Sequence, residues 1–351
     1  MTEIVKGVLN GGWSLVAGWI APSVVNVLIF ALFVLPPADD NDVVDRVLTT
    51  DFELKVALFV LCAAIVGLIL NAVQTPLYRF LEGYAWPSRA RSWGVGQQLR
   101  DKQKLDQDYE LAAYLSYDPS QLSEERWRHL EQLLANAGRK GSSVRQWEGA
   151  LILERLQRYP RKDDNVLPTR LGNAIRRFEL YADERYQLDS QSFWYQLRGL
   201  APEEMRKQED AARAGVDFFV AFFYGNALLM LGTVGLFLQS RDLATTVLVL
   251  AAMAVSMFMS YHLAVRATDE WAAAVEAMVD VGRKPLADGM GLKLPATLAE
   301  ERDMWRKLSR FVTDRYSAAS FPDEHRAFVE RAGPDESIAE VAPSPGARST
   351  E

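Results

Sequence analysis

The sequence predicts an all-α protein that crosses a membrane four times and carries a helical cytoplasmic body. Charge is unevenly spread, because the 351 residues include 39 basic and 46 acidic side chains, yet four windows of 23 residues contain none of them. The windows are Trp13–Leu35, Val56–Tyr78, Phe218–Ser240 and Leu243–Val265. A helix of that length rises about 34 Å, enough to cross a hydrocarbon core of about 30 Å. Between the windows, apolar residues recur at helical spacing, and no strand pattern is convincing.

The sequence allows two structures for the first window, whereas each of the other three windows is uninterrupted. Pro22 and Asn26 lie within it. One form is a single span that is kinked at Pro22. The other is an interfacial helix over Ile4–Gly18, followed by a short span over Ile20–Leu35. Either form completes an N-terminal membrane hairpin over residues 1–87.

The charges that flank the windows predict the orientation of the spans. The link Ala38–Glu53 holds six acidic residues and one basic residue, Arg46. Basic residues instead follow the second window, precede the third and follow the fourth. Examples are Arg79, Arg206 and Arg266. Cytoplasmic segments carry the excess of Lys and Arg. Residues 79–215 and 266–351, and both termini, are therefore expected in the cytoplasm.

The charged segments divide the rest of the chain. Residues 88–201 are expected to be a cytoplasmic helical region, with one helix starting at Ser123 and another from about Val144 to Tyr159. Pro202 starts a helix that meets no breaker before the membrane, so residues 202–282 are expected to form a long helical hairpin that holds the third and fourth windows. Residues 283–331 form a C-terminal helical region, and residues 332–351 are expected to be disordered.

The densest polar and aromatic group lies between Leu167 and Leu197. It comprises Arg170, Asn173, Arg176, Glu179, Tyr181, Arg185, Tyr186, Asp189 and Trp194. Arg176 reaches Glu179 at i,i+3 on the helix that Pro168 and Thr169 start. The group has two interpretations. It could be a polar pocket or gate that faces a pore axis, or an ion-pair and aromatic cluster that packs the cytoplasmic helices together, and the second is favoured because such clusters need no ligand.

Asn71 and Asn226 are the first candidates for polar contacts inside the membrane. No carboxylate, lysine or arginine lies within a window, although a proton-coupled pump usually needs one. The two amides could line a pore or hydrogen-bond between helices, and the second role is favoured. His262 lies at the cytoplasmic end of its window.

Several kinds of site are not expected. The single cysteine, Cys62, excludes a disulfide within the chain and a cysteine-based zinc site. The three histidines do not fall at the spacing of a helical metal pair, and Gly138–Ser143 lacks the spacing of a P-loop. With no catalytic constellation, neither an enzyme nor a cofactor is expected. The net charge of −7 argues against a nucleic-acid partner.

Three motifs together resemble a family of bacterial membrane proteins that has no assigned biochemical function. They are the PTxLGNxxRxxExYxxxRYxxDxxxxW pattern from Pro168, the QTPLxRxxEGYxWP pattern from Gln74 and the LPxTLxEERxxW pattern from Leu294. The resemblance implies a multi-pass protein of the bacterial inner membrane and transfers no activity. The order of spans and cytoplasmic segments is also similar, in topology only, to that of bestrophin-type anion channels.

The leading functional expectation is a non-enzymatic membrane scaffold or signalling module that binds a cytoplasmic protein partner through its helical body. The alternative is a homo-oligomeric ion channel with the bestrophin-like layout. In both cases the lipid bilayer is the first partner that the sequence implies.

Overall fold

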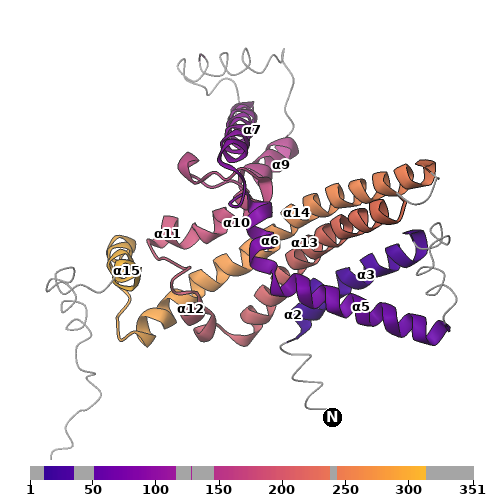
Figure 1. Cartoon of the computed structure of the whole chain (residues 1–351). Coiled ribbons are helices and arrows are strands. Elements are labelled where there is room, and N and C mark those ends of the chain that lie inside the picture. The colour runs from indigo at the N-terminus through magenta and orange to yellow at the C-terminus, as the bar shows by residue number, and fades with distance from the viewer. Residues whose placement is uncertain (1–11, 35–50, 116–127, 129–145, 238–242, 314–351) are drawn as a thin grey trace, which may run out of the picture. The chain divides into compact units, whose positions relative to one another are not determined.

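The computed structural model describes residues 12–34, 51–115, 128, 146–237 and 243–313, and their regular secondary structure is entirely helical (Figure 1). Four helical stretches are long and apolar enough to cross a membrane: Trp13–Leu32, Phe52–Ala72, Glu203–Gly235 and Ala244–Gly289. The prediction of an all-α chain with four candidate spans is therefore confirmed. The helix expected from Ser123 and the tail expected over 332–351 lie outside the described residues.

The first apolar run is one uninterrupted helix over the part that the structure describes. It comprises α2 (Trp13–Leu15), η1 (Val16–Ile20), α3 (Ala21–Ile29) and η2 (Phe30–Val34), where η1 and η2 are widened π-type turns. The ring of Pro22 would clash with the Gly18 carbonyl in a regular α-helix, and the wider turn of η1 precedes it at that place. The helix does not break between Gly18 and Ile20, while residues 4–11 lie outside the described part.

The second candidate span, α5 (Phe52–Ala72), packs closely on the first. A Cβ atom at Gly67 would lie 2.9 Å from the Trp19 carbonyl oxygen and 2.9 Å from the Ile20 Cα. Only glycine allows the two helices to approach so far, which is the usual role of small residues between membrane helices. Opposite this contact α5 exposes large apolar side chains, such as Leu61 and Ile69, as a lipid-facing helix does.

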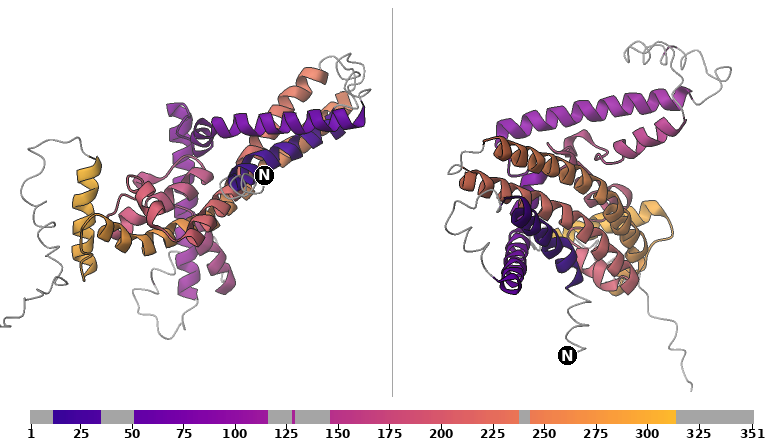
Figure 2. Two further views of the ribbon diagram at one scale, coloured as in Figure 1. Left: turned by 90° about the horizontal axis from the view of Figure 1, so that it is seen from below. Right: turned by 90° about the vertical axis from the view of Figure 1, so that its right-hand side faces the viewer.

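The chain turns sharply where it leaves the second candidate span. The short helix α6 (Gln74–Glu82) ends at Gly83, whose φ of +90° lies in the left-handed region that glycine adopts readily. The next helix, α7 (Ser88–Leu115), runs across the direction of α5 in both figures (Figures 1 and 2). Helix α7 therefore crosses the end of the span and does not continue it.

Two long helices carry the third and fourth candidate spans. Helix α13 covers Glu203–Phe237, and α14 covers Leu243–Gly289 with Pro285 near its end. Away from the apolar windows they are bonded to each other, because the Trp271 Nε1–H donates to the Glu209 Oε1 at 3.1 Å. The ring of Phe178 meets the Trp271 ring edge to face at 4.9 Å. The apolar face that α14 extends beyond its window is thus covered by other helices.

The remaining described elements belong to two compact units. The first unit comprises Met1–Tyr181 and Pro202–Met278, and the second Ala182–Ala201 and Val279–Glu351. Besides the candidate spans, the first unit contains α6, α7, α9 (Gln146–Leu156), η5 (Asp163–Asn165) and α10 (Arg170–Glu179). The second unit contains α12 (Trp194–Leu200) and α15 (Leu298–Thr313), and α11 (Tyr181–Tyr186) lies at the boundary along the chain. Trp305, Phe193 and Leu197 are fully buried in the second unit.

Candidate functional site

Two of the sequence motifs pack against each other and place the start of α10. A Cβ atom at Gly172 would lie 2.5 Å from the Glu82 carbonyl oxygen, and one at Gly94 would lie 2.7 Å from the Pro168 Cβ. A Cβ atom at Gly83 would likewise clash with the ring of Pro168. The glycines thus bring the exit of the second candidate span, the start of α7 and the start of α10 into backbone contact.

Asn173 holds the loop that leads into α10. Its Oδ1 accepts the Leu167 N–H at 2.7 Å, and its Nδ2 donates to the Leu167 carbonyl at 3.0 Å and to the Gln98 Oε1 at 3.3 Å. The Tyr159 hydroxyl donates to the same Gln98 oxygen at 3.0 Å. Only 1% of Asn173 is exposed, so its amide is committed to the fold and does not face a ligand.

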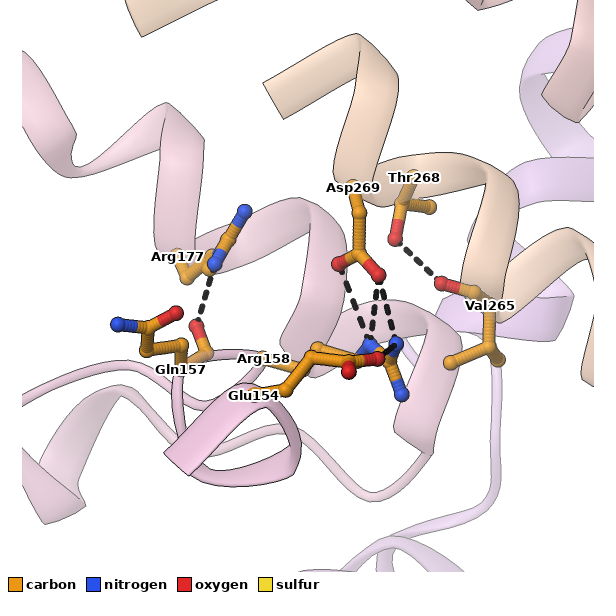
Figure 3. A network of polar contacts seen from close by, with 7 residues as sticks. All are labelled: Glu154, Gln157, Arg158, Arg177, Val265, Thr268 and Asp269. Carbon is orange, nitrogen blue, oxygen red and sulfur yellow. Dashed lines mark hydrogen bonds and ion pairs between the residues drawn. The ribbon is translucent and has the colours of Figure 1, made fainter. Parts of the chain in front are cut away.

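Arg158, just after α9, attaches this part of the chain to α14 (Figure 3). Its Nη2 lies 2.6 Å from the Asp269 Oδ2, and its Nε lies 3.0 Å and 3.2 Å from the two carboxylate oxygens. Glu154 accepts a further bond from Nη2 at 2.6 Å. The hydrogen bond to Asp269 is the largest cause that raises the pKa of Arg158. Nearby, the Arg177 Nη1 donates to the Gln157 carbonyl at 2.8 Å (Figure 3).

Beside this ion pair lies a pocket of about 450 Å³ between α7, the end of α9, the start of α10 and α14. Its charged lining consists of the bases Lys104, Arg155, Arg158, Arg170 and Arg266 and the acids Asp101 and Asp108. Leu105, Tyr159, His262 and Val265 complete it. Five cationic and two anionic side chains leave an excess of three positive charges in a chain whose net charge is −7.

The cations of the pocket differ in how far the protein neutralises them. Arg158 is paired with Asp269 and Glu154, and Arg170 lies 3.6 Å from the Asp101 carboxylate. Lys104, Arg155 and Arg266 have no ion-pair partner among the described residues. These three come from α7, α9 and α14, and Arg266 is the first charged residue after the fourth uncharged window. Within the part of the chain that the structure describes, the pocket therefore offers positive charge from three separate helices that no acidic side chain pairs with.

The predicted polar cluster includes one residue of this pocket, Arg170. Arg176 lies 3.3 Å from Glu179, and both side chains are about one-third exposed, which makes them an ordinary helical ion pair. Burial and, to a smaller extent, the negative charge of Glu179 together raise the pKa of Glu82 to about 7, against the opposing charge of Arg79. A carboxyl group that titrates near neutrality thus lies at the contact between the two motifs.

The other members of the predicted cluster lie at or beyond the boundary between the units. Tyr181 is the last residue of the first unit in this stretch, whereas Arg185, Tyr186, Asp189 and Trp194 belong to the second. The Tyr186 hydroxyl donates to the Asp280 Oδ1 at 2.7 Å, and the guanidinium carbons of Arg283 and Arg185 lie 4.0 Å and 5.7 Å from its ring centroid. Asp189 accepts the N–H groups of Gln191 and Ser192, and Trp194 starts α12. The structure thus distributes the cluster over two sets of contacts.

The two candidate intramembrane amides have different surroundings. The Asn226 Nδ2 donates to the Asn26 Oδ1 at 3.1 Å and to the Phe222 carbonyl at 2.8 Å, which joins α13 to α3. Gly225 makes room for this pair, because a Cβ there would lie 2.6 Å from the Asn26 Cγ. Asn71 lies at the end of α5, half-buried, and its side chain bonds to no other described residue.

Most of the residues that line the pocket could not be predicted from the sequence. Among its lining residues, the sequence singles out Arg170 as a member of the polar cluster, and His262 and Arg266 only by their places at the cytoplasmic end of the fourth window. Lys104 and Arg155 lie in helices that carry several other charged side chains, where a single base usually faces solvent. The strongest signal in the sequence is the position of Arg266 directly after an uncharged window.

Among the residues that the structure describes, no group of three or more His, Cys, Asp or Glu side chains is placed to hold a metal ion. Comparison of the chain with protein-family models, curated proteins and solved structures finds no match. The chemistry of the pocket and the packing of the helices therefore carry the functional argument.

Proposed function

We propose that this protein is a membrane-embedded scaffold or signalling module that acts through its helical cytoplasmic body and catalyses no reaction. The four candidate spans support the membrane part of the proposal. The flanking charges support a cytoplasmic position for the segment between the second and third spans and for the region after the fourth. The body would then present its surface to a cytoplasmic protein and convey a change there to the membrane helices.

The observation that carries the proposal is the attachment to α14 of the helical body, here α9 and α10. The bidentate pair of Arg158 and Asp269 and the contact of Phe178 with Trp271 fix α9 and α10 to the part of α14 beyond its apolar window. The Glu209–Trp271 hydrogen bond fixes α13 there as well. Because these helices are continuous with two candidate spans, movement of the body passes to the membrane through packed side chains.

Polar contacts within the spans favour this function over an ion channel. Asn226 bonds to Asn26, and the hydroxyl groups of Ser23, Thr233 and Ser260 bond to backbone carbonyls of their own helices. These polar groups thus form hydrogen bonds within a single chain. A pore lined by polar groups would leave such side chains free to face the ions that pass.

Ion flux from liposomes that contain the full-length protein separates the two functions. Chloride and potassium release should equal that of protein-free liposomes, and Asn226→Ala should leave it unchanged. Release above this baseline that Asn226→Ala alters would contradict a scaffold and establish the channel with a bestrophin-like layout.

A positive test places a photocrosslinking amino acid in living cells at exposed aromatic positions of the body. Trp93 on α7 and Tyr195 on α12 are 65% and 86% exposed. A scaffold should give the same crosslinked protein, identified by mass spectrometry, from at least one of these positions across repeated preparations. A matched probe at Leu248, an exposed position inside the fourth window, should give none. Crosslinks from Leu248 alone would contradict a cytoplasmic partner.

A further inference from the structure

We propose that the pocket of Lys104, Arg155 and Arg266 is a binding site for a phosphate-bearing anion at the cytoplasmic surface of the membrane. The proposal goes beyond scaffolding and holds whether or not the body recruits a protein. It rests on the charge of the pocket, on its size and on its place at the end of a candidate span.

The charge of the pocket calls for an anion. Lys104, Arg155 and Arg266 come from three helices and have no ion-pair partner among the described residues, although the chain as a whole has more acids than bases. Like charges that converge on one cavity repel each other in the folded state, and a bound anion removes that repulsion. Asp101 already lies beside Arg170, and the single negative charge of Asp108 does not balance the three positive charges of Lys104, Arg155 and Arg266.

The side chains suit phosphate in particular. Arginine presents a planar fork of donors that matches the oxygens of a phosphate group, and lysine adds a compact charge. Two arginines and a lysine on separate helices can surround one phosphate from several sides. A cavity of about 450 Å³ is larger than a lone phosphate ion and has the size of a small organic ligand site. A phosphate ester with a polar substituent therefore fits better than a simple ion.

Two other residues of the lining are held in place by the protein. Arg158 is fixed by two oxygens of Asp269, and the Tyr159 hydroxyl is fixed by Gln98. The pocket thus keeps its shape without a ligand, because its supporting groups are satisfied by the protein itself. Lys104, Arg155 and Arg266, which have no ion-pair partner among the described residues, are the part of the lining left for a ligand.

The location points to the membrane surface. Arg266 follows the uncharged Leu243–Val265 window directly, so it lies at the level where a membrane helix reaches the headgroups. Helix α7, which supplies Lys104, runs across the direction of α5 and so can lie along that surface (Figure 2). Basic pockets between helices at the cytoplasmic face attract the phosphates of anionic lipids. The same chemistry would also accept a phosphate ester from solution.

Thermal unfolding of the full-length protein distinguishes these sources. Protein in phosphatidylcholine nanodiscs is compared with protein in nanodiscs that also contain phosphatidylglycerol, and the first sample is titrated with inorganic phosphate. A higher melting temperature with phosphatidylglycerol alone identifies a lipid headgroup. A rise with millimolar phosphate identifies a soluble phosphate-bearing ligand. Either rise supports the site, and sodium chloride should weaken it.

Variants assign the effect to the pocket. Arg155→Gln and Arg266→Gln should each weaken the apparent affinity about tenfold, because each removes one charge-assisted contact. Neither base has an ion-pair partner among the described residues, and each adds to the repulsion within the pocket, so the melting temperature of each variant without ligand should be no lower than that of the wild type. Arg89→Gln removes the same charge from an exposed position of α7 outside the pocket and should leave the affinity unchanged. No stabilisation by either probe, or an equal loss in Arg89→Gln, would overturn the site.

Discussion

Arg158 and Asp269 form a bidentate ion pair, with the Arg158 Nε at 3.0 Å and 3.2 Å from the two carboxylate oxygens and Nη2 at 2.6 Å from one of them. The two residues are 111 positions apart in the chain. The pair joins the turn after α9 to α14, and its side chains are 15% and 36% exposed. Because a planar fork fixes orientation as well as distance, this contact sets how the body meets the long helix.

Loss of this ion pair should destabilise the folded protein. Asp269→Asn leaves a largely buried guanidinium without its main partner, which should lower the free energy of unfolding by about 1.5–3 kcal/mol. Glu154→Gln affects the same arginine, but Glu154 is 55% exposed, so the loss there should stay below about 1 kcal/mol. Chemical unfolding of both variants in the same detergent measures the difference. Equal losses would mean that Asp269 does not anchor the body.

The close backbone contact at Gly172 should tolerate no added side chain. Gly172→Ala would place a Cβ 2.5 Å from the Glu82 carbonyl oxygen, and backbone on both sides would have to shift. The expected loss in the free energy of unfolding is about 2 kcal/mol or more, by analogy with overpacked cores.

Gly215 is the matched control for that substitution. It lies inside α13, and apart from the adjacent residues and the nearby backbone of that helix, no described atom would lie within 4 Å of a Cβ there. Gly215→Ala should therefore stabilise the protein by about 0.5–1 kcal/mol, because alanine restricts the unfolded chain and favours helix. Calorimetric or chemical unfolding of the two variants should give shifts of opposite sign. A destabilising Gly215→Ala would instead indicate that the helix needs to flex at this glycine.

The four candidate membrane spans could be predicted as helices from the sequence because their cause is local. Each of the windows excludes charge over 23 residues, and neither Pro22 nor Asn26 prevents helix formation in the first. The role of Asn26 could not be predicted in the same way. Its partner, Asn226, lies 200 positions away, and only the fold shows that Gly225 leaves room for the pair.

The candidate pocket depended even more on distant packing. The Leu167–Leu197 segment was recognisable as a dense polar group, yet Arg170 faces the pocket while Tyr186 bonds to Asp280 in the other unit. Neighbours in sequence were thus divided, whereas Lys104 and Arg266, from opposite halves of the chain, were brought to one cavity. Helical periodicity reports which face of a helix is apolar and does not report which charged faces converge.

The titration of Glu82 should make stability depend on pH near neutrality. Its pKa in the folded protein is about 7, above the value of 4.5 expected for an unfolded chain. The folded state therefore holds this proton more tightly, and the resulting stability is present below about pH 4.5 and is lost as the pH rises through about 7. Glu82→Gln should be about 1 kcal/mol more stable than the wild type at pH 8 and similar to it at pH 4.5.

Melting curves of the two proteins between pH 4.5 and pH 8.5 measure this difference. Glu179→Gln serves as the second variant, because loss of its negative charge should lower the pKa of Glu82 and move the transition to lower pH. A difference between wild type and Glu82→Gln that does not change with pH would show that the carboxyl group is charged throughout the range.

The orientation of the chain in the membrane can be tested with single cysteines. Cys62 is exposed on α5 and is first replaced by alanine, so that only the introduced thiol reacts. Glu53, at the start of α5, is the last residue of the acidic link between the first two candidate spans, and Asp164 lies in η5. Both positions are exposed. The flanking charges predict that a membrane-impermeant maleimide added to intact spheroplasts labels Glu53→Cys at once and labels Asp164→Cys only after lysis. Both thiols should react in detergent, which controls for local reactivity.

Labelling of Asp164→Cys in intact spheroplasts would place the helical body outside the cell membrane. Arg266 and its pocket would then face the outer leaflet, where the positive-inside rule does not favour a cluster of bases.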